Sequence, residues 1–163
     1  MEIRLATPEE YTAVGDVTVA AYAPFLLGPT DPYSDRLRDA AGRAAAADLW
    51  VAVEDGRVLG TITDPPHGSP YRELAGEGES EFRMLAVDPA AQGRGVGDAL
   101  VRHLLERARA HGHRRVLISS LPEMTGAHRV YERLGFRRVP ELDWRPLADV
   151  LLIGFALDLE PLS

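Results

Sequence analysis

Residues 85–97 read LAVDPAAQGRGVG, and this stretch decides how the rest of the chain is interpreted. Three apolar residues come first, an Asp-Pro pair interrupts them, and Gly93, Gly95 and Gly97 then precede an amphipathic segment. The pattern predicts a strand, a glycine-rich turn and a helix in succession. Successive glycines let backbone N–H groups turn toward one point, to which the helix N-terminus adds partial positive charge. The stretch therefore predicts a cradle for a pyrophosphate group.

Two other phosphate-binding motifs compete for this stretch. In a dinucleotide fingerprint starting at Gly93, the third glycine would fall at Asp98, whose carboxylate would repel the phosphate. A Walker motif requires a lysine, and all 18 basic residues of the chain are Arg. A glycine-rich turn that binds no ligand is the remaining alternative.

The segments on both sides of the turn predict an α/β pattern. Apolar and β-branched runs predict strands at 3–5, 49–53, 58–63, 81–87, 116–119, 136–139 and 150–157. Helical periodicity and capping residues predict helices at 7–21, 31–47, 97–111 and 125–134. One hairpin and two strand–helix–strand steps require antiparallel and parallel pairing together, so we expect a mixed sheet.

The irregular stretch at 64–78 is the longest between these elements. It holds three Pro and three Gly, and a loop of that length in a compact domain is often functional. His67 lies within it and is the only histidine that we would test for contact with a substrate. The five His show no metal-ligand spacing, so we expect no metal site.

Length and composition narrow the class of protein. The 163 residues fit a single domain spanning residues 1–163. The chain has no Cys, which excludes disulfides, thiolate zinc sites and a cysteine nucleophile. Without Lys it also cannot form a Schiff base, which excludes pyridoxal chemistry.

Charge and hydropathy restrict the partners. A net charge of −7 repels the phosphate backbone, which disfavours nucleic-acid binding. The longest uncharged apolar stretch, residues 17–29, is shorter than the roughly 20 residues that a membrane span needs. Residues 1–10 lack the apolar core of a secretory signal. We therefore expect a cytoplasmic protein with no membrane partner.

The charge is distributed unevenly along the chain. Residues 1–93 contain 7 Arg against 16 acidic residues, a balance of −9. Residues 94–138 contain 10 Arg against 4 acidic residues, a balance of +6. This basic segment indicates an anionic ligand, although a solvated Arg-rich helix face would give the same composition.

Two motifs together resemble one family. The glycine-rich stretch is similar to the acyl-CoA-binding signature of the GNAT superfamily of N-acetyltransferases, Gln/Arg-x-x-Gly-x-Gly/Ala after a strand. The downstream stretch 131–136, YERLGF, resembles the second motif of that family. The resemblance implies an α/β (α+β) fold with a mixed, mostly antiparallel sheet of six to seven strands and about four helices. It also implies direct transfer of an acetyl group from acetyl-CoA to a primary amine within a ternary complex.

The resemblance carries cofactor contacts over to this chain. In the family, the bulged fourth strand pairs with the pantetheine arm and polarises the thioester carbonyl, and the glycine-rich turn holds the pyrophosphate. Basic residues of the second motif are candidates for the 3′-phosphate of CoA. The matching positions are Leu85, Ala86, Val87, Gln92, Gly93, Arg94, Gly95, Val96, Gly97, Arg129 and Arg133.

Catalytic roles carry over in the same way. Tyr131 matches the general acid that protonates the departing thiolate, with a core aromatic in an apolar helix stripe as the alternative. Glu81 matches the glutamate that serves some members as the base, and Glu79 is second; both could instead be solvated edge charges. Many members have Asn seven residues before the tyrosine, where this chain has Met124 followed by Thr125.

The acceptor is the least specified part of the interpretation. The −9 balance of residues 1–93 favours a cationic small molecule. A protein N-terminus or a lysine side chain is the alternative acceptor, and a non-catalytic CoA-binding module is the alternative function. We leave a homodimer open as the assembly.

Overall fold

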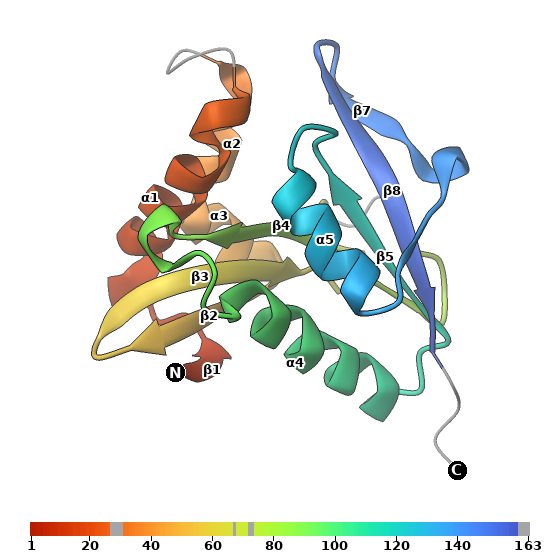
Figure 1. The fold of residues 1–163 in the computed structure, drawn as a ribbon, viewed down its shortest axis with the longest axis horizontal. Helices are drawn as coiled ribbons and strands as arrows, with labels where there is room; N and C mark the ends of the chain where they lie inside the picture. Colours follow the sequence, from red (N-terminus) through yellow and green to blue (C-terminus); the bar gives the residue numbers. More distant parts are fainter. Residues whose placement is uncertain (27–30, 67, 72–73, 160–163) are drawn as a thin grey trace.

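A computed structural model describes residues 1–26, 31–66, 68–71 and 74–159, and Figure 1 shows its fold. Its strands are β1 (Glu2–Leu5), β2 (Asp48–Glu54), β3 (Arg57–Asp64), β4 (Glu79–Val87), β5 (Arg115–Ser120), β6 (Arg137–Arg138), β7 (Trp144–Leu147) and β8 (Val150–Asp158). Its α-helices are α1 (Tyr11–Tyr22), α2 (Pro32–Arg38), α3 (Ala40–Ala46), α4 (Val96–Ala110) and α5 (Thr125–Arg133). No helix within these described ranges has the length and apolar character needed to cross a bilayer.

The strands form one mixed sheet in the order β1-β2-β3-β4-β5-β8-β6, with β7 paired to β8. Only the β4–β5 pair is parallel among the described strands, and every other pair is antiparallel. The predicted mixed, mostly antiparallel sheet is therefore confirmed. The described residues contain eight strands and five α-helices, against the expected six to seven strands and about four helices.

Two apolar clusters lie on the two faces of the sheet. One packs α4 against the sheet and includes Leu100, Leu104 and Phe82. The other packs α1 and α2 against the opposite face and includes Val14 and Tyr33. In Figure 1, α4 and α5 accordingly lie together on one side, apart from α1, α2 and α3.

The predicted helix at 31–47 is wrong as a single element, because the chain breaks it into α2 and α3 at Asp39. The Asp39 carboxylate accepts a hydrogen bond from the Gly42 N–H at 2.9 Å and caps the start of α3. The buried Arg43 guanidinium donates to the carbonyls of Arg36 and Leu37 at 2.7 and 2.9 Å, which satisfies the end of α2. Side chains thus replace the helical hydrogen bonds at the break.

Two C-terminal strands also differ from expectation. The predicted strand at 136–139 is reduced to the two residues of β6, and the segment expected to be a connection contains β7. Pro146 interrupts the β pattern of that segment, but β7 is an edge strand, where a missing N–H is tolerated. The indole Nε1 of Trp144 donates to Ser119 Oγ at 3.0 Å and ties β7 to β5.

A bulge in β4 positions the site. Thr61 and Thr63 of β3 pair with Ala86 and Arg83 of β4, so β4 holds one extra residue, and Met84 has a left-handed φ of 54°. The β4–β5 pairing covers only the first four residues of β4, ending at Phe82. Beyond that point these two fully described strands separate.

Candidate functional site

The glycine-rich turn lies at the N-terminus of α4, between β4 and that helix. Gly93 and Gly95 have φ values of 82° and 78°, a left-handed conformation that glycine adopts without strain. Gly95 is the N-cap of α4, and an added Cβ at either glycine would meet no atom within 4 Å. The first N–H groups of a helix lack helical partners, so this open turn can receive an anion.

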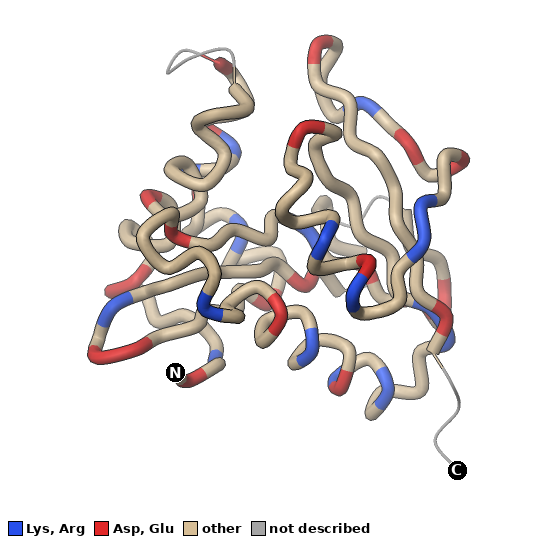
Figure 2. The backbone as a smooth tube through the Cα atoms, viewed as in Figure 1, with Lys and Arg blue, Asp and Glu red and all other residues tan. Residues whose placement is uncertain are grey.

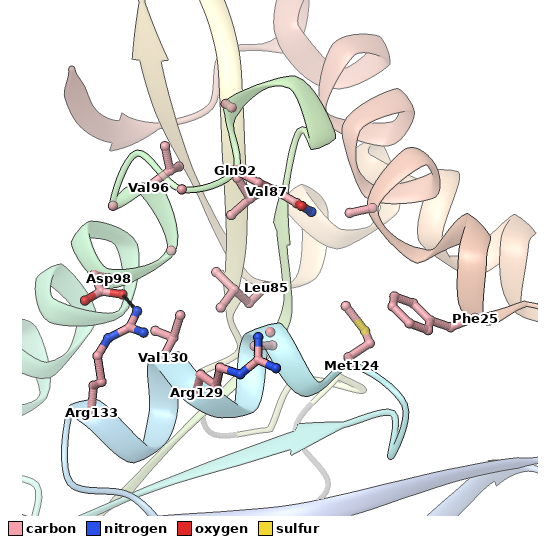
Figure 3. A pocket seen from close by; sticks show the side chains of 17 residues that line it. Phe25, Leu85, Val87, Gln92, Val96, Asp98, Met124, Arg129, Val130 and Arg133 are labelled. Carbon is pink, nitrogen blue, oxygen red and sulfur yellow. Dashed lines mark hydrogen bonds and ion pairs between the residues drawn. The ribbon is translucent and has the colours of Figure 1, made fainter.

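A cavity of about 570 Å³ opens beside the turn and runs between α4 and α5 (Figure 3). Nine of the eleven predicted cofactor residues line it. They are Leu85, Val87, Gln92, Gly93, Gly95, Val96, Gly97, Arg129 and Arg133.

The other two predicted cofactor residues lie outside this cavity lining. The Arg94 side chain is half exposed and forms an ion pair with Glu54 on the β2–β3 hairpin. Ala86 is buried in the apolar cluster beneath α1 and pairs with Thr61 of β3. Neither pairing is visible in the local motif, because both partners come from β2 and β3.

Two arginines of α5 border the cavity. Arg133 is ion-paired with Asp98 of α4, with Nη2 and Oδ1 2.6 Å apart. Arg129 is exposed, and its guanidinium projects from α5 toward the cavity (Figure 3). Arg129 is therefore the better placed of the two for an additional phosphate.

The cavity reaches from one face of the sheet to the other. Leu85 belongs to the cluster beneath α4, whereas Ala21 and Met124 belong to the cluster beneath α1, and all three line the cavity. Phe25 and Met124 lie side by side at the end away from the turn (Figure 3). The sequence drew attention to Met124 only as a departure from the family's Asn, and it gave no local signal for Ala21 or Phe25.

Tyr131 lies behind the cavity lining. Its side chain is 2% exposed and packs against Phe136 and Phe155, with ring centroids 5.9 and 5.5 Å away. Burial raises the pKa of its hydroxyl well above the usual range, and a hydrogen bond with Ser120 opposes this by less. The hydroxyl is therefore protonated at neutral pH, and the same shift makes it a weaker proton donor than an exposed tyrosine.

The two candidate bases have different surroundings. Glu81 is fully buried, and its Oε1 accepts hydrogen bonds from the N–H groups of Leu74 and Ala75 at 2.7 and 2.9 Å. Glu79 forms an ion pair with Arg115 at 2.7 Å. The long loop thus folds over Glu81, whereas Glu79 belongs to the junction of β4 and β5.

The pKa of Glu79 argues against its use as a base. Burial acts to raise this pKa, but the Gly76 N–H and the guanidinium groups of Arg115 and Arg114 together hold it below its usual range. A carboxylate stabilised in its charged form is a weak proton acceptor. His67, the histidine that we would test for contact with a substrate, lies outside the described residues.

Comparisons with known proteins agree with this geometry. Residues 16–136 match the sequence model of the acetyltransferase (GNAT) family. N-acetylaspartate synthetase of Rattus norvegicus is 33% identical over 95 residues, which cover 58% of this chain and 29% of that protein. The chain thus spans less than a third of the length of that relative.

Solved structures share the fold. The ribosomal-protein-S18-alanine N-acetyltransferase of Escherichia coli superposes with a TM-score of 0.70 at 17% identity, covering 99% of this chain and 96% of that chain. A GNAT family acetyltransferase of Brucella melitensis, solved in complex with acetyl-CoA, has a TM-score of 0.62 at 27% identity and covers 98% and 91%. The expected fold class is confirmed.

Proposed function

Because this chain belongs to the GNAT family of acetyltransferases, we propose that it transfers an acetyl group from acetyl-CoA to a primary amine by direct attack in a ternary complex. The observation that carries the proposal is the cavity that joins the glycine-rich turn to the opposite face of the sheet. A cofactor phosphate and an acceptor amine can approach the same gap between β4 and β5 from opposite sides.

The residues of the cavity fit acetyl-CoA. Gly93 and Gly95 leave the space above the α4 N-terminus open, which suits a pyrophosphate. Arg129 offers a cation for a third phosphate, and the apolar Leu85 and Val87 border the passage that a pantetheine arm would follow. When bound, acetyl-CoA supplies the thioester carbonyl carbon that an amine attacks.

The chain's own residues would move two protons in this reaction. A C–N bond forms at the carbonyl carbon and the C–S bond breaks, so the amine loses a proton and the thiolate gains one. We assign the first proton to the Glu81 carboxylate, directly or through water, and the second to the Tyr131 hydroxyl. Met84, three residues after Glu81, has the positive φ that turns the β4 backbone at the bulge.

The acidic residues whose excess favoured a cationic acceptor are not concentrated at the site. Figure 2 shows acidic positions along the whole chain, many of them beside basic ones. Glu10, Asp16 and Asp88 form ion pairs with arginines of residues 1–93, and Glu54 pairs with Arg94. Exposed charges farther than about 8 Å are largely screened at physiological salt. The balance therefore supports a cationic acceptor only weakly.

One assay separates this function from its alternatives. Thiol release from acetyl-CoA, measured with pooled small amines, amino acids and peptides, should occur with at least one pool. Turnover of peptides alone would identify a protein acetyltransferase. Binding of CoA without thiol release from any pool would identify a non-catalytic CoA-binding module.

CoA should raise the melting temperature of the protein. A ligand that binds only the folded state stabilises it by about 2.7 kcal/mol at a hundredfold excess over Kd, which for this length is a shift of about 5–10 °C. Dephospho-CoA, which lacks the 3′-phosphate, should give a smaller shift if Arg129 holds that group. No shift at millimolar CoA would contradict the acyl-CoA assignment.

Tyr131→Phe should keep the fold and CoA affinity while lowering kcat about ten- to a thousandfold. The ring that fills the core remains, and loss of the hydrogen bond with Ser120 should cost about 1 kcal/mol of stability. Without the hydroxyl the thiolate must leave unassisted, which its ordinary pKa of about 8.5 permits slowly. Steady-state kinetics at pH 7 measure the loss. A wild-type kcat with normal CoA binding would restrict Tyr131 to a core role.

A further inference from the structure

Arg83 is a buried cation whose hydrogen bonds are incomplete. Its side chain is 2% exposed, and Nη1 donates to the Tyr71 carbonyl at 3.2 Å. The guanidinium carbon lies 5.0 Å from the centroid of the Trp144 ring. Its Nη2 is buried without a hydrogen-bond partner, and Arg83 forms no ion pair within the described part of the chain. Burying a charge in this way is costly unless an anion compensates it.

Arg43, the other fully buried arginine, also has a nitrogen without a hydrogen-bond partner, Nε, but its charge is compensated. Its Nη1 donates to the two carbonyls that end α2, so its charge meets the negative end of a helix. Its role is therefore structural. Arg83 meets a loop carbonyl, the Tyr33 hydroxyl and an aromatic face, and none of these carries a full counter-charge.

Arg83 lies beside the bulge of β4, next to the residues that line the cavity but outside its lining. It directly precedes Met84 of the bulge, and Leu85 after it lines the cavity. It is also the first residue of β4 beyond the pairing with β5, where the two strands separate. Its contacts, Tyr33 of α2, Tyr71 of the long loop and Trp144 of β7, come from three separate segments of the chain.

We propose that Arg83 binds the carboxylate of the acceptor, so that the amine substrate is an amino acid or a similar amine carrying an acid group. This inference rests on the proposed acetyl transfer. The unpartnered Nη2 carries two N–H donors, and a guanidinium matches a carboxylate in charge and planar geometry. The Trp144 ring and Tyr71 carbonyl hold that guanidinium in place.

The neighbouring Glu81 supplies a negative group that would match the ammonium end of the same acceptor. Glu81 and Arg83 are two positions apart on β4, before the bulge, so both lie on the same face with Cα atoms about 6.6 Å apart. A negative and a positive group in this order match the ammonium and carboxylate ends of an amino acid. This pairing explains how an acid-bearing substrate is accepted by a protein with a net charge of −7.

The test compares matched acceptors on the wild-type protein. Thiol release from acetyl-CoA is measured with α- and ω-amino acids, each beside its own amide, and with polyamines and peptides. We expect at least one amino acid to exceed its amide about a hundredfold in kcat/KM. Turnover of amides or polyamines at equal or higher kcat/KM would overturn the Arg83 proposal and leave acetyl transfer standing. No turnover with any amine would overturn both.

Variants of Arg83 test whether this residue causes the preference for an amino acid over its amide. Arg83→Gln should lower kcat/KM for the amino acid about 10²- to 10³-fold and for its amide less than about threefold. Arg83→Lys should give an intermediate loss of kcat/KM for the amino acid, because lysine keeps the positive charge but lacks the paired N–H donors of the guanidinium. Arg102→Gln, which removes an exposed arginine of α4, is the matched control and should change neither.

The shift in melting temperature with CoA verifies that each variant is folded. Equal losses for amino acid and amide in a folded Arg83→Gln protein would overturn the assignment to Arg83. If that variant does not fold, the wild-type ratio and Arg83→Lys decide the question.

Discussion

Replacing Gly95 with glutamate is expected to abolish CoA binding. Gly95 has a φ of 78° at the start of α4, and an added Cβ meets no atom within 4 Å, so the substitution should cost only about 1 kcal/mol of backbone strain. The new carboxylate would occupy the anion position at the helix N-terminus, where it is itself favourable. Juxtaposed like charges cost several kcal/mol, which weakens binding about a thousandfold or more. Isothermal titration with CoA measures the loss.

Gly112→Glu is the matched control for that experiment. Gly112 follows the other end of α4, has a φ of 74°, and likewise has open space around an added Cβ. The variant introduces the same charge and the same backbone strain about 25 Å away along the helix, at 1.5 Å per residue. It should bind CoA like the wild type. Equal loss of CoA binding in both variants would show that strain or charge in general, rather than the glycine-rich turn, determines affinity.

Glu81→Gln is expected to lower kcat/KM about 10²- to 10⁴-fold at neutral pH, with CoA affinity unchanged. The glutamine carbonyl can still accept the N–H groups of Leu74 and Ala75, so the loop should keep its position. Without the base, only the fraction of acceptor that is already a free amine reacts. The rate of the variant should therefore rise with pH up to the pKa of the acceptor amine, whereas the wild type levels off earlier. A pH–rate profile from pH 6 to 10 measures this difference.

Glu79→Gln separates catalysis from stability. This change removes the ion pair with Arg115 at the junction of β4 and β5, so it should lower the melting temperature and leave the pH–rate profile intact. If Glu79→Gln shifts the profile and Glu81→Gln does not, the base is Glu79. If neither does, water accepts the proton without help from either carboxylate.

The cofactor side of the site was largely predictable from sequence. A glycine with positive φ and a helix N-terminus depend on neighbours within a few residues, so the stretch 92–97 specifies the cradle locally. The family motif extended this to Leu85, Val87 and Arg129, and the structure places all three at one cavity. Arg94 departed from the pattern because its partner, Glu54, lies 40 residues away.

Among the helices and strands, too, some were predictable from local sequence and others depended on distant contacts. Apolar periodicity was sufficient for α4, whose buried side chains form one stripe. It was insufficient for 31–47, where Asp39 and Arg43 replace helical hydrogen bonds with side-chain ones. It was also insufficient for β7, whose pairing depends on β8 rather than on its own residues.

The surroundings of the charged residues of β4 were decided by tertiary structure alone. Alternation places Glu79, Glu81 and Arg83 on one face of β4, because all three precede the bulge, but it does not tell what each of them meets there. Glu79 and Glu81 are equivalent in sequence, yet Arg115 neutralises the first and loop N–H groups meet the second. Arg83 is a buried cation because Tyr71 and Trp144 pack against it in the folded chain. The sequence by itself determined the open glycine-rich turn, since turn and helix-end chemistry are local. The fold determined the surroundings of Glu79, Glu81 and Arg83, since burial and charge pairing depend on residues far apart in the chain.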